Sequence, residues 1–292
     1  MRGGCGNVAQ ANAFVRTSSH MKVLLRETAL SGRVRVYTLG GDEVATSFGA
    51  NCVAVRGERG TLLVDPLVAP AHARRVAAAI AAAGFPPVSH VVLTHHHTDH
   101  ALGAGLFAAR GARVYAHRRC AEAMASFHPA LVAARRGVPA LAGLFADAEP
   151  YAPGELFEES RRIDLGDLAV EVRHLGPGHT QGDAVVLLPS EGLAVAGDVL
   201  QSGYHANCED ADRDGVRRSL STLSSLAARF VPGHGEPGGA ELVAAQVRYH
   251  DEVERIALGA ASPQEAEREL LRLHPGYLLA AAVPEAVRFW RR

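Results

Sequence analysis

One stretch near the first third of the chain constrains its fold more than any other. The apolar residues at 91–93 run directly into Thr94-His95-His96-His97-Thr98-Asp99-His100. Three β-favouring apolar residues predict a buried strand, and Thr94 begins the loop at its end. A strand end is a rigid platform, and imidazole and carboxylate groups are ligands for zinc, iron or manganese. The stretch therefore predicts a metal site at the end of a strand.

Three further residues of ligand type follow apolar runs in the same way. Each comes directly after a glycine, which lets the backbone pass close to a crowded site. A lone histidine pair would fit a solvated loop, but four strand ends that deliver metal-type side chains favour a metal site. The three residues are His179, Asp198 and His234.

The pattern Thr94-His95-x-His97-x-Asp99-His100, followed by His179, Asp198 and His234, resembles that of the metallo-β-lactamase superfamily of metallohydrolases. The resemblance extends from about Val34 to about Gly235 and includes the strand expected at 61–65. It implies an α/β fold, a four-layer αβ/βα sandwich of two mixed β-sheets with outer helices. The ligand-bearing loops would all open at one edge of this sandwich.

The resemblance also implies roles for single residues. Asp198 would bridge two metal ions, and Asp65 would orient a ligand histidine. True β-lactamases of the superfamily usually carry Cys or Ser at or near the position of Asp198, whereas thioesterases, lactonases and phosphodiesterases carry Asp. The resemblance therefore does not imply β-lactam hydrolysis. Each ion would have three further ligands, in the sets His95, His97 and His179, and Asp99, His100 and His234.

Two divalent ions of this kind share one water and lower its pKa to near 7. The expected cofactors are two zinc ions, with iron or manganese as alternatives. The expected enzyme is a hydrolase that uses the bridging hydroxide on a small acyl substrate such as a thioester, a lactone or a related ester. Asp99 is the candidate proton carrier, and Tyr204 and His205 are candidate substrate contacts. A phosphodiesterase or nuclease on the same metals, and an iron-dependent dioxygenase or other redox enzyme, are the alternatives.

Charge and composition limit the classes of binding partner that we expect. The 292 residues carry a formal net charge of −1, so no broad basic field predicts binding to nucleic acid or to an anionic membrane. Four cysteines occur without a CxxC motif, which is typical of free thiols in a reducing compartment. No apolar run reaches the ~20 residues of a membrane span. We expect a cytoplasmic protein, and the sequence leaves its oligomeric state open.

Three segments are expected along the chain. Residues 1–20 form a flexible leader, 21–238 the metallo-β-lactamase-like domain, and 239–292 a helical extension packed on that domain. Inside the domain, 118–165 is expected to be a helical insertion, either a lid or a surface excursion, with breaks at 128–129 and 137–139. Ser262 is expected to cap a helix that begins at Pro263. Strands are expected at 34–39, 51–55, 61–65, 91–93, 113–116, 168–175, 184–188, 193–196 and 230–231, and helices at 69–83, 103–110 and 215–228.

Overall fold

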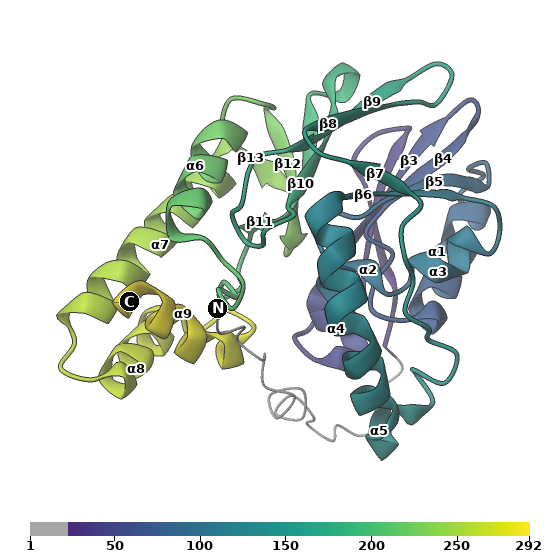
Figure 1. Cartoon of the computed structure of the whole chain (residues 1–292). Coiled ribbons are helices and arrows are strands. Elements are labelled where there is room, and N and C mark those ends of the chain that lie inside the picture. Colours follow the sequence, from purple (N-terminus) through teal and green to yellow (C-terminus); the bar gives the residue numbers. More distant parts are fainter. Residues whose placement is uncertain (1–22) are drawn as a thin grey trace.

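The computed structural model describes residues 23–292, which form two β-sheets packed face to face (Figure 1). The leader expected at 1–20 lies outside the described residues. The first sheet has seven strands in the order β1 to β7, antiparallel from β1 to β4 and parallel from β4 to β7. Its strands are β1 (Arg26–Ala29), β2 (Val34–Thr38), β3 (Asn51–Gly57), β4 (Gly60–Val64), β5 (Val88–Val92), β6 (Arg113–His117) and β7 (Glu155–Phe157).

The second sheet has six strands in the order β13-β12-β11-β10-β9-β8. All its neighbours are antiparallel except β11 and β12, which run parallel. The parallel pair matters for the site, because both of its strands end at the same edge. The strands are β8 (Ser160–Asp164), β9 (Ala169–His174), β10 (Ala184–Leu188), β11 (Leu193–Gln201), β12 (Arg229–His234) and β13 (Gly238–Gly239).

Helices cover the outer face of each sheet, so the four-layer sandwich expected from the sequence is confirmed (Figure 1). One apolar cluster fills the space between the sheets, and separate clusters lie between each sheet and its helices. The outer helices of the first sheet are α1 (Pro70–Ala82), α2 (Thr98–Ala101), α3 (Ala104–Ala108), α4 (Arg118–Arg136) and α5 (Pro139–Ala142). Those of the second sheet are α6 (Arg213–Leu223) and α7 (Ala240–Gly259). The short 3-10 helices are η2 (Val44–Gly49), η3 (Pro189–Glu191) and η4 (Ala280–Ala282).

The insertion at 118–165 differs from its prediction in two ways. The helix break at His128-Pro129 is wrong, because α4 continues through Pro129 to Arg136. A proline inside a helix costs about 3 kcal/mol, and the buried face of α4, with Met124 and Val132, stabilises the continuous helix against that cost. The segment is also not helical throughout, because its end supplies β7 to the first sheet and β8 to the second. Short, half-exposed strands such as these give little periodic signal.

The C-terminal residues form a helical unit. α7 is followed by α8 (Pro263–Leu273) and α9 (Val283–Arg291), and the Ser262 side chain accepts a hydrogen bond from the Glu265 amide, which confirms the predicted cap. Phe289 and Trp290 pack among these helices and against the loop after β11. None of the helices in residues 23–292 combines the length and apolar character of a membrane-spanning segment.

Candidate metal centre

The segment from Thr94 to His100, here called the ligand loop, begins at the end of β5 and is fixed there by Asp65. This residue adopts a left-handed conformation, with φ of 57°, which is unfavourable for a residue other than glycine. Its carboxylate accepts hydrogen bonds from the Thr94 amide at 2.8 Å and the Thr94 hydroxyl at 2.7 Å. The same carboxylate lies 2.9 Å from Nδ1 of His100. Asp65 therefore fixes both the start of the loop and the ring of one candidate ligand.

The first cluster consists of His95, His97, His179 and Asp198, whose ligand atoms all lie within 4.8 Å of one another. Nε2 of His179 lies 3.0 Å from Nδ1 of His97 and 3.6 Å from the Asp198 carboxylate. Because Thr94 donates its hydroxyl proton to Asp65, its oxygen accepts the proton of His95 Nδ1, at 2.9 Å. The lone pair of His95 Nε2 is thus directed into the cluster.

The second cluster consists of Asp99, His100 and His234. The Nε2 atoms of the two histidines lie 3.2 Å apart, and both lie within 3.5 Å of the Asp99 carboxylate. Nδ1 of His234 donates to the Phe48 carbonyl at 3.0 Å, so its Nε2 also faces the cluster. Asp198 lies between the two clusters, 3.2 Å from His100 and 3.3 Å from His234.

Two glycines make room for these side chains. A Cβ atom at Gly233 would lie 1.8 Å from an Asp198 carboxylate oxygen, and one at Gly197 would lie 2.5 Å from the Thr94 hydroxyl. Gly197 also has a φ of 52° at an irregular point of the β11–β12 pairing. The expectation that glycine lets the backbone pass close to the site is confirmed at both positions.

The carboxylates and imidazoles of the two clusters shift one another's pKa. Burial lowers the pKa of His179 to about 3, so this imidazole is neutral. Although burial opposes it, the carboxylates of Asp198 and Asp99 raise the pKa of His234 to about 9. Burial alone would raise the pKa of Asp99, but His100 and His234 lower it to about 2. The carboxylates of Asp99 and Asp198 thus favour positive charge beside them, which is the charge that a divalent ion supplies.

The donor set fits such ions. His95 Nε2 is buried and has no hydrogen-bond partner within residues 23–292, which is costly for a polar atom unless something binds it. Neutral imidazole and carboxylate groups are the ligands that zinc takes in proteins. All seven candidate ligands predicted from the sequence lie in these two adjoining clusters.

Comparison with known proteins identifies the family. The family model of the metallo-beta-lactamase superfamily matches residues 45–234. The chain belongs to this superfamily. A metallo-beta-lactamase type 2 from Bacteroides fragilis is 28% identical over 165 residues, which are 53% of this chain and 57% of that protein. A hydroxyacylglutathione hydrolase from Fuscovulum blasticum is 28% identical over 205 residues, 64% of this chain and 67% of that protein.

Solved structures agree on the fold. A metallo-beta-lactamase from Pontibacter korlensis superposes with a TM-score of 0.64 at 21% identity and covers 77% of this chain and 98% of its own. One of the two relatives above is named as a hydrolase. The chain thus combines the fold of the superfamily with candidate metal-binding clusters.

Sequence reasoning missed one contributor to this superfamily site, Asp210. Its carboxylate lies 3.0 Å from Nε2 of His97 and 3.3 Å from Nε2 of His96. The bond fixes the proton of His97 on Nε2 and leaves Nδ1 free for an ion, as outer carboxylates do for metal-binding histidines. His96 shares this carboxylate with His97. Asp210 stands in an irregular loop before α6, where no periodic pattern predicts its position.

The two predicted substrate contacts lie in different surroundings. The ring of Tyr204 lies 5.2 Å from that of His234, and its hydroxyl donates to the Gly41 carbonyl at 3.0 Å. His205 faces the C-terminal helices instead, with Nδ1 2.9 Å from the Tyr249 hydroxyl. Tyr204 therefore lies beside the clusters of candidate ligands, whereas His205 packs within the C-terminal helical unit.

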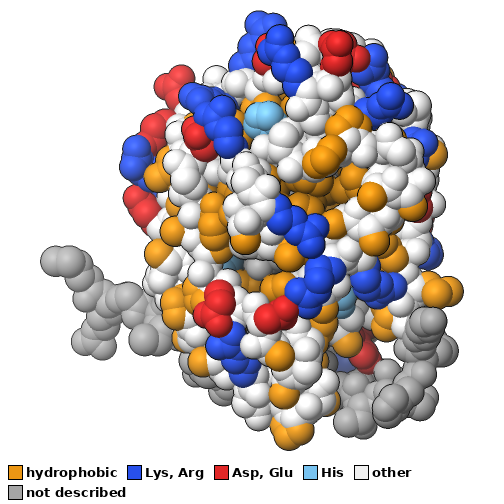
Figure 2. Space-filling model, turned by 90° about the vertical axis from the view of Figure 1, so that its right-hand side faces the viewer, with side chains coloured by type: hydrophobic (Ala, Val, Ile, Leu, Met, Phe, Trp, Pro, Cys, Tyr) orange, Lys and Arg blue, Asp and Glu red, His pale blue; other side chains and the backbone are white. Residues whose placement is uncertain are grey.

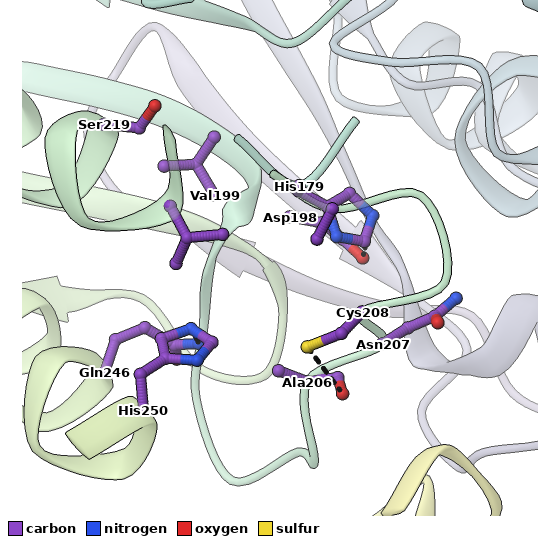
Figure 3. Close-up of a pocket in the computed structure, with 11 residues that line it drawn as sticks. His179, Asp198, Val199, Ala206, Asn207, Cys208, Ser219, Gln246 and His250 are labelled. Atoms are coloured by element: carbon purple, nitrogen blue, oxygen red, sulfur yellow. Dashed lines mark hydrogen bonds and ion pairs between the residues drawn. The ribbon is translucent and has the colours of Figure 1, made fainter. Parts of the chain in front are cut away.

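A cavity adjoins the first cluster on the side of the C-terminal helices. Figure 3 shows His179 and Asp198 on one side of it and Gln246 and His250 on the other. Cys208 lies between them, with its thiol directed to the Ala206 carbonyl. The volume open to the centre of a water molecule is about 10 Å³, which is room for roughly one water. An acyl substrate does not fit in this cavity.

Proposed function

We propose that the chain is a dinuclear metal-dependent hydrolase that acts on a small acyl substrate, a thioester, a lactone or a related ester. The position of Asp198 carries this proposal, since one carboxylate lies within 3.6 Å of histidines from both clusters. One ion would be held by His95, His97 and His179, and the other by Asp99, His100 and His234, with Asp198 shared between them.

When bound, two zinc ions lower the pKa of a shared water, so that hydroxide is available at neutral pH, and polarise the acyl oxygen. The chain itself supplies orientation and a proton carrier. Thr94, Asp65, Asp210 and the Phe48 carbonyl each hold the outer nitrogen of a ligand histidine. Asp99 lies within 3.5 Å of both histidines of the second cluster, and its carboxylate is the group we assign to carry a proton to the leaving group.

The acyl preference rests on three supports. At the proposed bridging position stands an aspartate, which the resemblance associates with thioesterases, lactonases and phosphodiesterases rather than with true β-lactamases. One relative is named a hydroxyacylglutathione hydrolase. On the face drawn in Figure 2, basic side chains are interspersed with acidic ones and do not merge into one patch that would suit a nucleic acid.

The test combines metal content with substrate choice. Protein purified without added metal and then saturated with Zn²⁺ should hold two ions per chain by elemental analysis. Under one metal condition, kcat/KM should be highest for a thioester or lactone within a panel that also holds a β-lactam and a phosphodiester. A β-lactam or phosphodiester that wins by more than about tenfold, roughly 1.4 kcal/mol in transition-state stabilisation, would refute the acyl assignment. Asp99→Asn should lower kcat by more than its loss of metal explains.

A further inference from the structure

Helix α4, which the sequence suggested as part of a lid or a surface excursion, contacts the outside of the ligand loop at two points. Nε2 of His128 donates a hydrogen bond to the His96 carbonyl at 2.7 Å. Nη1 of Arg135 donates to the Thr98 hydroxyl, also at 2.7 Å. Positions 128 and 135 are two helical turns apart and therefore share one face of α4. The exposed fractions of the two residues are only 1% and 8%.

Arg135 is an unusual residue for an interior. Its guanidinium packs 5.2 Å from the centre of the Phe145 ring and interacts electrostatically with Asp99. Burial lowers its pKa to about 10, so it stays charged at neutral pH. A buried cation is costly unless it has partners, and its hydrogen-bonded partner here belongs to the ligand loop. An apolar residue at this place in α4 would pack at lower cost.

The element that α4 contacts is not stable by itself. Thr98 is the first residue of α2, a helix of four residues that carries Asp99 and His100. An isolated helix of this length does not persist in water, so the direction of both ligand side chains depends on contacts from outside. Ser47 makes such a contact on another side, since its hydroxyl donates to the Asp99 carbonyl at 3.0 Å.

We propose that α4 is a brace for the second metal site, and that Arg135 is a positioning residue for Asp99 and His100, whereas His128 holds the segment between His95 and His97 of the first site. The inference rests on the ligand assignment of the proposed function. It predicts a selective effect, because α2 carries ligands of the second ion only. His179, by contrast, belongs to a different loop, and His95 is held by Thr94.

Arg136 offers a matched control on the same helix. Its guanidinium donates hydrogen bonds to the carbonyls of Phe145 and Ala148 and to the Glu149 carboxylate, and within residues 23–292 it makes no hydrogen bond with the ligand loop. Arg135→Met should lower the affinity for the second Zn²⁺ by about 10- to 100-fold, the usual effect of removing an outer partner of a ligand. The affinity for the first Zn²⁺ should change by less than about threefold. Arg136→Met should lower the melting temperature without changing either affinity.

A second pair of variants keeps the test independent of folding. His128→Gln retains an N–H donor for the His96 carbonyl and should preserve both affinities. His128→Leu should weaken binding of the first ion, because His96 lies between two of its ligands, His95 and His97. Affinities are measured by chelator competition with Zn²⁺, and Co²⁺ absorption reports each site separately.

Three outcomes would refute the proposed brace. Arg135→Met could bind both ions as tightly as the wild type, or it could lose affinity for both ions equally. Arg136→Met could also lower the affinity for the second ion as much as Arg135→Met does. These readouts need no substrate. A wild type that binds two ions but hydrolyses no acyl compound would therefore refute the proposed substrate and leave the brace standing.

Discussion

The contact between Gly233 and Asp198 gives the sharpest prediction. Gly233→Ala would place a methyl group 1.8 Å from the Asp198 carboxylate oxygen, where ordinary contacts begin at 3.4 Å. Gly233 has no positive φ, but the methyl group would also lie 2.7 Å from the Gly197 carbonyl carbon and 2.9 Å from the Asp198 amide nitrogen, so β11 must shift slightly as well. The carboxylate must move by more than about 1 Å, whereas a zinc–oxygen bond of about 2.0–2.2 Å leaves little tolerance. A displacement of this size costs about 100-fold in turnover, and we also expect the loss of one ion.

The fold should survive this change. Insertion of one methyl group into a packed region costs about 1–3 kcal/mol of unfolding free energy, which circular dichroism and thermal melts would show as a shift of a few degrees. Gly154→Ala is the control, because its Cβ would have no neighbour within 4 Å and its φ is not positive. If Gly233→Ala keeps two ions and wild-type turnover, Asp198 does not bridge the ions in the way we propose.

Three more predictions follow from other contacts. Asp198→Ala should lose the second ion and most activity while circular dichroism stays unchanged, and two retained ions with normal turnover would contradict the bridge. Burial lowers the pKa of His250 to about 4, so between pH 6.5 and 4 the unfolded chain binds more protons and the free energy of unfolding falls with falling pH. His250→Gln should flatten that slope by up to ~1.4 kcal/mol per pH unit in urea titrations, and an unchanged slope would contradict it. Ser262→Ala should destabilise the protein by about 1 kcal/mol through loss of the cap on Glu265, whereas an unchanged urea midpoint would show that the cap contributes nothing.

The ligands could be predicted from sequence because each follows a local signal. His95 to His100 come after an apolar strand, and His179 comes after a glycine at the end of another. The strands were found where they are buried, and β10 was predicted with its observed ends, 184–188. Two ligands, Asp198 and His234, proved to lie within the last residues of β11 and β12 rather than after them.

The missed features depend on tertiary contacts. β1 is exposed along its whole length and therefore lacks the alternation that reveals a half-buried strand. Asp210 contacts His97 only because the loop before α6 folds toward it. No spacing of residues along the chain predicts this contact. α4 crosses Pro129 because its buried side chains hold it, and a local rule about proline does not include that packing.

The candidate ligands of the two clusters come from both sheets of the sandwich. His95, His97, Asp99 and His100 follow β5 of the first sheet, whereas the remaining ligands belong to the second sheet or to its loops. Ions held in this way would link segments far apart in the chain, and binding to the folded state alone stabilises it in proportion to the logarithm of metal concentration. Metal availability would then govern stability as well as activity. Chelation should lower the melting temperature, and added metal should raise it.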